Sequence, residues 1–523
     1  MLLSSCLTAL LAAPFCSAAS LSRKVSSVVN QTTCDGKHFT YEALAGYGFI
    51  PSNARDKYGD TIGGIGSSIA LDRASWKKTK SGSYTGILWA LPDRGWNTQG
   101  TLNFQNRVHK IALTLTPAPS ASVSTPSPPN LQLTYLDTIL FTGPDGTPVT
   151  GLDADITGSI TYPGFPILPV ATFTGNGFGQ PGPGGKRIAI DSEGLVLAPD
   201  GSFWVSDEYG PYIYQFSPKG KMLQAIKPPD AYIPHRNGSV SFSANSPPIY
   251  APGQVPIPAN TESGRNNNQG LEGLTVSADG NTLFALMQSA LDQEGGPSNP
   301  NRRQARLLEY DISSPSKPKY KHEFVVTLPL WTDPTAKPGK QLKVAGQSEI
   351  HSLGHGQFFV LARDSGAGHG QPSSTSIYRH VDIFDISGSS GATDIKSATN
   401  DATTGAIADA TGTLKPGIQP AEYCSFLDFN VNSELGKFGL HNGGAQDAGL
   451  LNEKWEGLAL GPVDGKDGDD GEWFLFSLSD NDFVTQDGHL NFGTYSYSDA
   501  SGYNLDNQAL VFQVKLPKSA DPS

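Results

Sequence analysis

Short hydrophobic segments recur along the chain and are separated by polar turns. The fullest example starts at Asp191 and runs through Leu195-Val-Leu, the turn Asp200-Gly201, Phe203-Trp-Val and a further segment ending at Phe216. Short runs bounded by Asp-Gly turns are typical of antiparallel strands joined by hairpins. The pattern therefore predicts a nearly all-β protein.

The same unit is repeated, because five copies are visible when the chain is compared with itself. They start near Ser67, Glu193, Glu272, Glu349 and Glu456. Each copy reads as four antiparallel strands, which is a propeller blade, and a blade buries both faces only when it is stacked with others in a ring. The wide intervals before Glu193 and before Glu456 leave room for a degenerate copy, so we expect six blades. We expect a single domain over residues 20–523, with long loops on one face.

The N-terminal segment, residues 1–19, is apolar and ends in small residues, which predicts a signal peptide and a secreted protein. No later run is long enough to span a bilayer. Two cysteines remain in the mature chain, Cys34 and Cys424, and an oxidising compartment favours their pairing. The sequons at Asn30 and Asn237 predict glycosylation.

The chain carries 37 basic and 49 acidic residues, a formal net charge of −12. A surface of this sign repels phosphate backbones and anionic lipids, so we expect neither nucleic-acid nor membrane partners. A monomer is expected.

Acidic residues recur at two places in the repeat, the start of the first strand and the end of the second. In a propeller these two places share one rim of the central channel. The predicted rim carboxylates are Asp93, Glu193, Asp207, Glu208, Glu272, Glu349, Asp364, Glu456 and Asp480, and all of them except Asp93 and Asp364 are candidate metal ligands. Converging carboxylates raise one another's pKa, and a bound cation relieves this; an all-oxygen set suits Ca²⁺. Two alternatives stay open: the carboxylates accept backbone N–H bonds from the next blade as structural staples, or some act in acid–base catalysis.

Basic and histidine side chains lie in the loops of the same face. Arg187, Arg236, Arg94 and Arg363 are candidates to bind an anionic substrate, because the guanidinium fork fits phosphate or carboxylate. Ion pairs with the rim acids are the alternative interpretation. His351 and His235 are candidate general bases, although either could be an ordinary histidine.

Motifs of common hydrolases are missing from the sequence. It has no Gly-x-Ser-x-Gly, no His-Glu-x-x-His and no Walker loop. Serine hydrolases of that type and zinc peptidases lose support.

Three motifs resemble the phytase-like family, which is described by an esterase-like activity of phytase. They are Asp191-Ser-Glu-Gly-Leu, Trp204-Val-Ser-Asp-Glu-Tyr-Gly-Pro and Asn268-Gln-Gly-Leu-Glu-Gly-Leu, and the likeness spans about residues 46–515. The family's recurring acidic positions match Asp191, Glu193, Asp207, Glu208, Glu272 and Glu456. The chain departs from the pattern at Ser348-Glu-Ile, where Gly-Leu is lost, and at Gln288, where the strand-end acid is replaced. The resemblance implies hydrolysis of phosphate or carboxylic esters.

The sequence thus predicts a secreted, calcium-assisted ester hydrolase that acts on a small anionic ester at the channel mouth. Phosphate esters are slightly favoured over carboxylic esters or lactones. The alternative is a non-catalytic secreted propeller that binds a glycan or a protein partner through the same loops.

Overall fold

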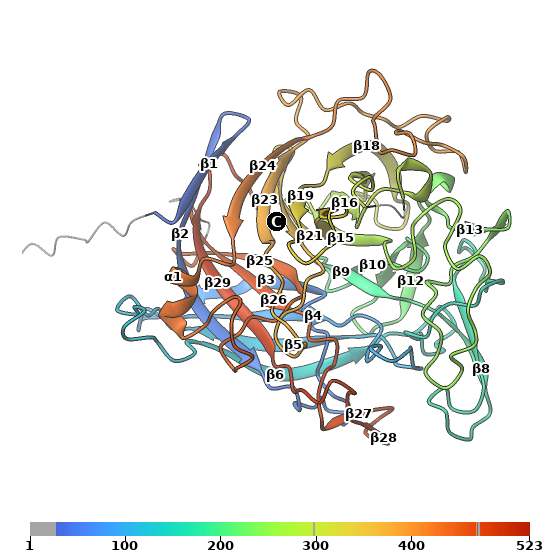
Figure 1. The fold of residues 1–523 in the computed structure, drawn as a ribbon, viewed down its shortest axis with the longest axis horizontal. Helices are drawn as coiled ribbons and strands as arrows, with labels where there is room; N and C mark the ends of the chain where they lie inside the picture. Colours follow the sequence, from blue (N-terminus) through green and yellow to red (C-terminus); the bar gives the residue numbers. More distant parts are fainter. Residues whose placement is uncertain (1–27, 297–298, 467, 469–470) are drawn as a thin grey trace, which may run out of the picture.

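The computed structural model describes residues 28–296, 299–466, 468 and 471–523, so the predicted signal peptide at residues 1–19 lies outside the described residues. Five antiparallel sheets are arranged around a central axis (Figure 1). The protein is nearly all β, as the hydrophobic pattern predicts.

Each blade has four strands in antiparallel order, the first lying innermost. Blade 1 contains β3 (Ser68–Lys78), β4 (Tyr84–Leu91), β5 (Arg107–Leu115) and β6 (Leu131–Leu140), and blade 2 contains β9 (Ser192–Leu197), β10 (Phe203–Asp207), β11 (Ile213–Phe216) and β12 (Met222–Ile226). Blade 3 contains β15 (Leu271–Val276), β16 (Thr282–Met287), β17 (Gln304–Asp311) and β18 (Lys319–Thr327), and blade 4 contains β21 (Gly346–Gly354), β22 (Gln357–Arg363), β23 (Arg379–Asp385) and β24 (Glu422–Asp428). Blade 5 contains β25 (Trp455–Pro462), β26 (Glu472–Ser479), β29 (Asn507–Lys515) and β2 (Lys37–Ile50), with β1 (Asn30–Cys34) as an extra outer strand.

The expectation of six blades is wrong, and the five visible repeats are the five blades. The innermost strands contact one another in the closed order β3, β9, β15, β21, β25 and back to β3. The wide intervals that suggested a sixth blade hold loops and small elements instead. The first contains the hairpin of β7 (Val170–Phe173) and β8 (Gly185–Ile188), and the second contains α1 (Asn432–Leu435) and η3 (Gly436–Phe438).

The remaining described elements are short and belong to loops. They are the pairs β13 (His235–Arg236) with β14 (Ser239–Val240), β19 (Leu330–Thr332) with β20 (Leu342–Val344), β27 (Gly488–Leu490) with β28 (Tyr495–Tyr497), and the 3-10 turns η1 (Asp230–Tyr232) and η2 (Asp292–Glu294). None of the helices in the described part of the chain has the length and apolarity needed to cross a membrane.

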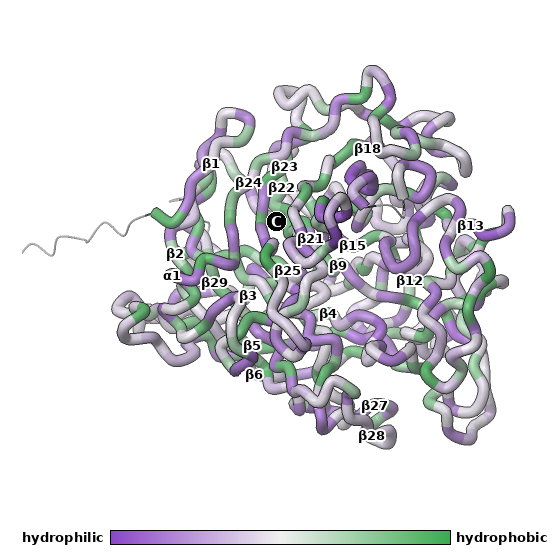
Figure 2. Tube along the Cα trace, in the orientation of Figure 1, coloured by the Kyte–Doolittle hydropathy of each residue, from purple (hydrophilic) through white to green (hydrophobic). Residues whose placement is uncertain are grey.

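A large hydrophobic cluster fills each of the five interfaces between blades. Trp204 of blade 2, for example, packs in one cluster with Leu274 of blade 3, and Phe284 of blade 3 packs with Phe358 of blade 4. The cluster between blades 5 and 1 joins Leu88 to Phe476. Hydrophobic colour follows strands such as β22 and β25, whereas the β27–β28 hairpin is more hydrophilic (Figure 2). Stacking in a ring is thus what buries both faces of every sheet.

Two interactions close the ring: a strand pairing within blade 5 and a disulfide between blade 5 and blade 4. The N-terminal strand β2 pairs with the C-terminal strand β29, from Thr40 opposite Lys515 to Ile50 opposite Asn507. The predicted disulfide is confirmed: Cys34 at the end of β1 is bonded to Cys424 in β24 of blade 4, with Cα atoms 5.9 Å apart. It fastens the blade that contains both chain ends to its neighbour.

Both predicted glycosylation sites are on the surface. Asn30 is exposed in β1, and Asn237 is exposed in the turn between β13 and β14. Glycosylation itself stays a prediction.

Candidate functional site

A cavity of about 240 Å³ lies at one end of the central channel, where the innermost strands begin and the second strands end. We call this end the rim. Five of the predicted carboxylates line the cavity: Glu193, Glu208, Glu272, Glu456 and Asp480. The shared direction of the innermost strands brings together residues that are far apart in sequence, as the repeat suggested.

A β-bulge aims Glu193, Glu272 and Glu456 into the cavity. In blade 3, Leu271 pairs with Met287 but Gly273 pairs with Leu286, so Glu272 is the extra residue of the bulge. The same shift occurs at Glu456 and around Glu193. A bulge turns one side chain out of the regular alternation of a strand. The Glu-Gly-Leu motif is the sequence of this bulge.

The glycine after each glutamate is needed because the neighbouring blade lies against it. A Cβ atom added to Gly194 would stand 2.4 Å from the Cβ of Leu274, and one added to Gly273 would stand 2.9 Å from the backbone nitrogen of Ile350. Real Cβ atoms do not approach this closely. The glycines therefore allow the innermost strands to approach one another at the axis.

Glu349 does not lie on the rim, which corrects the sequence-based expectation. In blade 4 the bulge falls at Ser348, because Gln347 pairs with Ala362 and Glu349 with Leu361. Glu349 thus occupies the glycine position of the other blades, and Ser348 the glutamate position. The sequence comparison was out of register by one residue here.

The Glu349 carboxylate is a structural staple inside the channel. Its Oε1 accepts the N–H groups of Leu274, at 3.1 Å, and of Ile350, at 2.9 Å, and its Oε2 accepts the hydroxyl of Ser68. Ser68 Oγ in turn accepts the N–H of Leu195 at 3.0 Å. This network joins blades 1, 2, 3 and 4 at the axis. For Glu349, the alternative that the carboxylate is a structural staple is therefore the correct one.

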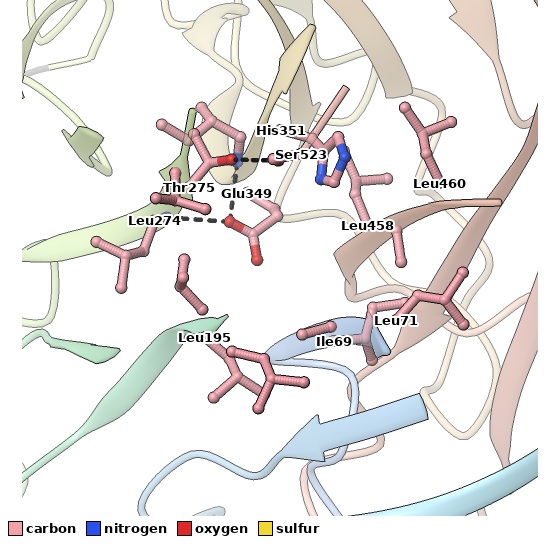
Figure 3. Close-up of a pocket in the computed structure, with 16 residues that line it drawn as sticks. Ile69, Leu71, Leu195, Leu274, Thr275, Glu349, His351, Leu458, Leu460 and Ser523 are labelled. Carbon is pink, nitrogen blue, oxygen red and sulfur yellow. Dashed lines mark hydrogen bonds between the residues drawn. The ribbon is translucent and has the colours of Figure 1, made fainter. Parts of the chain in front are cut away.

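Beyond Glu349 the channel is apolar and narrow. A cavity of about 80 Å³ there is lined by leucine side chains such as Leu195, Leu274 and Leu458, and also by His351 and Ser523 (Figure 3). His351 follows Glu349 by two residues on β21, so it lies further from the rim, and it does not line the rim cavity. Burial lowers the pKa of His351 to about 4. Its ring Nε2 is buried without a hydrogen-bond partner among the described residues.

Asp207 and Glu208 are neighbours in sequence but differ in their surroundings. The Asp207 carboxylate accepts four hydrogen bonds, from the N–H groups of Asp191, Tyr209 and Gly210 and the hydroxyl of Tyr214, at 2.9–3.0 Å. Both carboxylate oxygens of Glu208 are buried without a hydrogen-bond partner in the described part of the chain. Asp207 therefore shapes the end of β10, whereas Glu208 has its ligand positions free.

Further oxygen atoms at the rim share the condition of Glu208. The buried oxygens without a hydrogen-bond or ion-pair partner among the described residues include Oδ1 of Asp191, Oε2 of Glu272 and Oδ1 of Asn268. Oxygen atoms of Asp191, Glu193 and Glu208 lie within 4.8 Å of one another. Buried polar groups are rarely left unpaired in native proteins, and an unplaced ion is one explanation when they are.

The rim carboxyls are electrostatically strained. Burial, followed by the charges of Glu272, Asp191 and Glu208, raises the pKa of Glu193 well above its usual value. Burial, followed by Glu208 and Glu456, does the same for Glu272. A cation placed among these groups would reverse both effects.

Positive side chains balance part of this charge. Arg94 Nη1 lies 2.9 Å from Oδ2 of Asp191, and Arg363 pairs with Glu456 and, at 3.4 Å, with Glu453. Arg94 and Arg363, which the sequence predicted, therefore do reach the rim. Both form ion pairs with acidic residues, which was the alternative to binding an anionic substrate.

Among the predicted basic and histidine residues, Arg363 lines the rim cavity, whereas Arg94, Arg187, Arg236 and His235 do not. Arg236 donates to the carbonyls of Ser243 and Ala259 within its own loop, at 3.0 and 3.2 Å. His235 Nδ1 lies 2.8 Å from the carbonyl of Ile233. Arg187 lies in a different cavity, formed by the β7–β8 hairpin and its neighbours.

The family model described as "Phytase-like: Esterase-like activity of phytase" matches residues 61–483. The chain belongs to this family. A relative from Arthroderma benhamiae, described as an uncharacterized secreted protein, is 60% identical over 479 residues, which is 91% of this chain and 93% of the relative.

The resemblances to solved structures are distant. A luciferin-regenerating enzyme is 10% identical, with 87% of this chain and 94% of that chain covered and a TM-score of 0.27. Kuenenia stuttgartiensis hydrazine synthase is 8% identical, with 81% and 78% covered and the same TM-score. With overlays this poor, neither structure informs the assignment of the site.

Several rim residues of this phytase-like protein were not among the predicted site residues. Arg302 and Lys454 line the cavity, together with Asn268. Lys454 Nζ lies 2.7 Å from Asp482 and 3.3 Å from Asp480. A signal was present for two of them, because Lys454 precedes the Trp-Glu-Gly-Leu motif by one residue and Asn268 begins the Asn-Gln-Gly-Leu-Glu motif. Arg302 lies in a long insertion without periodicity, so the sequence placed it only among the basic residues in the loops of the carboxylate-bearing face.

Proposed function

We propose that this phytase-like protein is a secreted ester hydrolase that works with a calcium ion bound at the rim. The observation that carries the proposal is a set of buried oxygens that have no hydrogen-bond or ion-pair partner among the described residues: Oδ1 of Asp191, both carboxylate oxygens of Glu208, Oε2 of Glu272 and Oδ1 of Asn268. They lie beside a cavity large enough for a small substrate. Carboxylate and amide oxygens without thiol or imidazole are the donors that a hard cation prefers.

The proposed ligands are Asp191, Glu193, Glu208, Glu272 and Asn268. Asp207 and Glu349 are not included, because donors within the protein already occupy their oxygens. A bound calcium would polarise the ester oxygen and lower the pKa of a coordinated water.

The chain's own residues would bind the substrate and move the proton. Arg302 Nε is buried without a hydrogen-bond partner among the described residues, so this guanidinium is free to bind an anionic group of the ester. Arg363 holds Glu456 in place. Since neither histidine candidate lines the cavity, we assign the proton-accepting role to Asp480, whose Oδ1 accepts the N–H of Asp482 at 2.6 Å and whose Oδ2 faces Lys454.

Phosphate esters are the favoured substrate class, because Arg302 brings to the cavity wall a guanidinium without an acidic partner among the described residues, and a guanidinium fork matches phosphate oxygens. Carboxylic esters and lactones need no such cation. They are the second class to be tested.

The decisive experiment measures turnover and metal binding on the same preparations. Protein secreted into culture medium, with its mature N-terminus sequenced to test export, is assayed on p-nitrophenyl phosphate, p-nitrophenyl acetate and phytate, with and without chelator. We expect turnover that chelator abolishes and calcium restores. Glu208→Gln should lower kcat/KM by about a hundredfold or more and weaken calcium binding by at least about tenfold, because it removes a charged ligand.

Glu262→Gln is the matched control, since it removes the same charge from an exposed loop position. It should leave both readouts unchanged. Calcium binding without turnover on any of the three substrates would contradict catalysis and favour the glycan- or protein-binding propeller. Turnover that is insensitive to chelator would contradict the role of the metal.

A further inference from the structure

A second cavity, of about 290 Å³, lies in the loops and shares no lining residue with the rim cavity. We call it the loop pocket. Its walls come from the β7–β8 hairpin, the segment before β5 and the turn between β27 and β28. A volume near the lower end of the range for small-ligand sites fits a ligand of monosaccharide size.

Arg187 brings an uncompensated positive charge into the loop pocket. Its Nη1 donates to Oδ1 of Asn103 at 2.9 Å, and its guanidinium lies over the ring of Phe173, 5.3 Å from the centroid. Burial lowers its pKa, and no acidic neighbour in the described part of the chain counters that effect. A half-buried guanidinium held by an amide and a ring, without a carboxylate, is a site for an external anion.

Arg107 lines the same pocket and shows what a compensated arginine looks like here. It is 2% exposed and pairs with Asp56 at 2.7 Å and with Asp60 at 2.9 Å. Its positive charge is compensated by these two carboxylates. Arg187 is therefore the group in this pocket that is left to recognise an anion.

Phe492 supplies an apolar surface at the same pocket. Its side chain is 52% exposed, although it contacts Tyr58 edge to face at 5.7 Å between centroids. Both Asn491 and Phe492 have left-handed backbone angles, with φ of 55° and 58°. A bulky residue in this conformation is uncommon and costly, and such strain is concentrated at functional positions.

We propose that the loop pocket binds a sugar acid, with its carboxylate on Arg187 and one face of its ring on Phe492. The remaining lining fits hydroxyl groups, because Asn103, Gln105, Asn176 and Asn491 contribute amides that can both donate and accept hydrogen bonds. Phe173 and Phe178 complete the apolar part of the wall. This site is independent of the proposed hydrolytic function.

The test is titration of the purified full-length protein with galacturonate and with glucuronate, followed by calorimetry and ligand-observed NMR. We expect saturable binding, at least about tenfold tighter than that of galactose or of inorganic phosphate. A trigalacturonate arm distinguishes the free monosaccharide from a polymer end: tighter binding of the trimer identifies the polymer end as the source of the ligand.

Arg187→Gln should weaken uronate binding at least about tenfold, and Phe492→Ala should weaken it several-fold. Arg55→Gln is the control, because Arg55 is an exposed arginine paired with Asp487 outside the pocket lining. If Arg187→Gln does not fold, Phe492→Ala decides, since this exposed ring supports little core packing. Absence of uronate binding, equal binding of galactose or phosphate, or unchanged binding in either variant would overturn the proposal. Glu208→Gln should leave uronate binding intact, which separates this test from that of the rim.

Discussion

The carboxyl group of Glu349 is central at the scale of single residues, because it accepts hydrogen bonds from blades 3, 4 and 1 at the channel axis. Glu349→Gln keeps an acceptor and a donor at the same place, as the protonated carboxyl does. Glu349→Ala leaves buried N–H groups unpaired and opens a void. We expect the alanine variant to lose about 2–4 kcal/mol of unfolding free energy and the glutamine variant about 1 kcal/mol or less, measured by urea unfolding at pH 5.

The difference in unfolding free energy between wild type and Glu349→Gln depends on pH, and the sign of this dependence follows from burial. Burial raises the pKa of Glu349 well above its usual 4.5, so the folded state holds a proton that the unfolded chain releases. The stability that this carboxyl contributes is complete below pH 4.5 and is lost as the pH rises toward the folded pKa. Wild type should therefore lose stability relative to Glu349→Gln between pH 5 and pH 8. A constant difference across this range would contradict the assignment.

His351 gives the opposite sign. Burial lowers the pKa of His351 to about 4, so the unfolded chain takes up a proton below pH 6.5 that the folded protein resists. This penalty reaches at most about 2 kcal/mol at pH 5. The unfolding free energy of His351→Asn relative to wild type, measured by urea unfolding, should therefore be higher at pH 5 than at pH 7.5. Its kcat for any ester should match wild type, and a collapse of kcat would reinstate His351 as a base.

At the scale of secondary-structure elements, both the disulfide and strand β2 hold the propeller ring closed. The bond from Cys34 to Cys424 spans 390 residues, and cross-linking positions so far apart is worth up to about 6 kcal/mol in the chain-entropy model. Strand β2 also closes the ring through its ladder with β29. The Cys34→Ser/Cys424→Ser variant should melt several degrees lower by calorimetry and exchange amide hydrogens faster in β1 and β2. An unchanged melting temperature would mean that the β2–β29 ladder alone secures the ring.

The strands and the shared rim could be predicted from the sequence because they rest on local pattern and on the fixed direction of strands in a blade. The hairpin turns at Asp200-Gly201 and Asp279-Gly280 are examples, with both glycines at positive φ. The blade number was not predictable, since interval length does not distinguish a loop from a degenerate blade. Arg187 and Arg236 lie in insertions without periodicity, so nothing local fixed where their side chains point.

The one-residue slip at Glu349 has a different cause. A β-bulge inserts one residue without changing composition, and Ser348-Glu349 looks like Ser192-Glu193 in a comparison of letters. What identifies the register is the pairing of β21 with β22, which puts Ser348 in the bulge and Glu349 at the position that Gly194, Gly273 and Gly457 hold in the other blades. That pairing is visible only when the blade is assembled.

At the scale of the whole molecule, calcium at the proposed site would couple metal binding to the packing of blade 2 against blade 3. The proposed ligands come from β9 and β10 in blade 2 with their flanking residues, and from β15 in blade 3 with the loop before it. Without a cation, their buried charges repel one another across the blade interface, and calcium should therefore stabilise the folded ring by mass action.

Chelator should accordingly lower the melting temperature of wild type by several degrees, and added calcium should restore it. Glu208→Gln changes both sides of this balance, because it removes one repelling charge and one ligand. The variant should melt higher than wild type in chelator, and it should gain less than wild type when calcium is added. Differential scanning calorimetry at fixed ionic strength measures both shifts, with Glu262→Gln as the charge-matched control that should behave as wild type. If wild type and Glu208→Gln respond alike to calcium, the rim carboxylates do not bind the metal, and their buried oxygens need another partner.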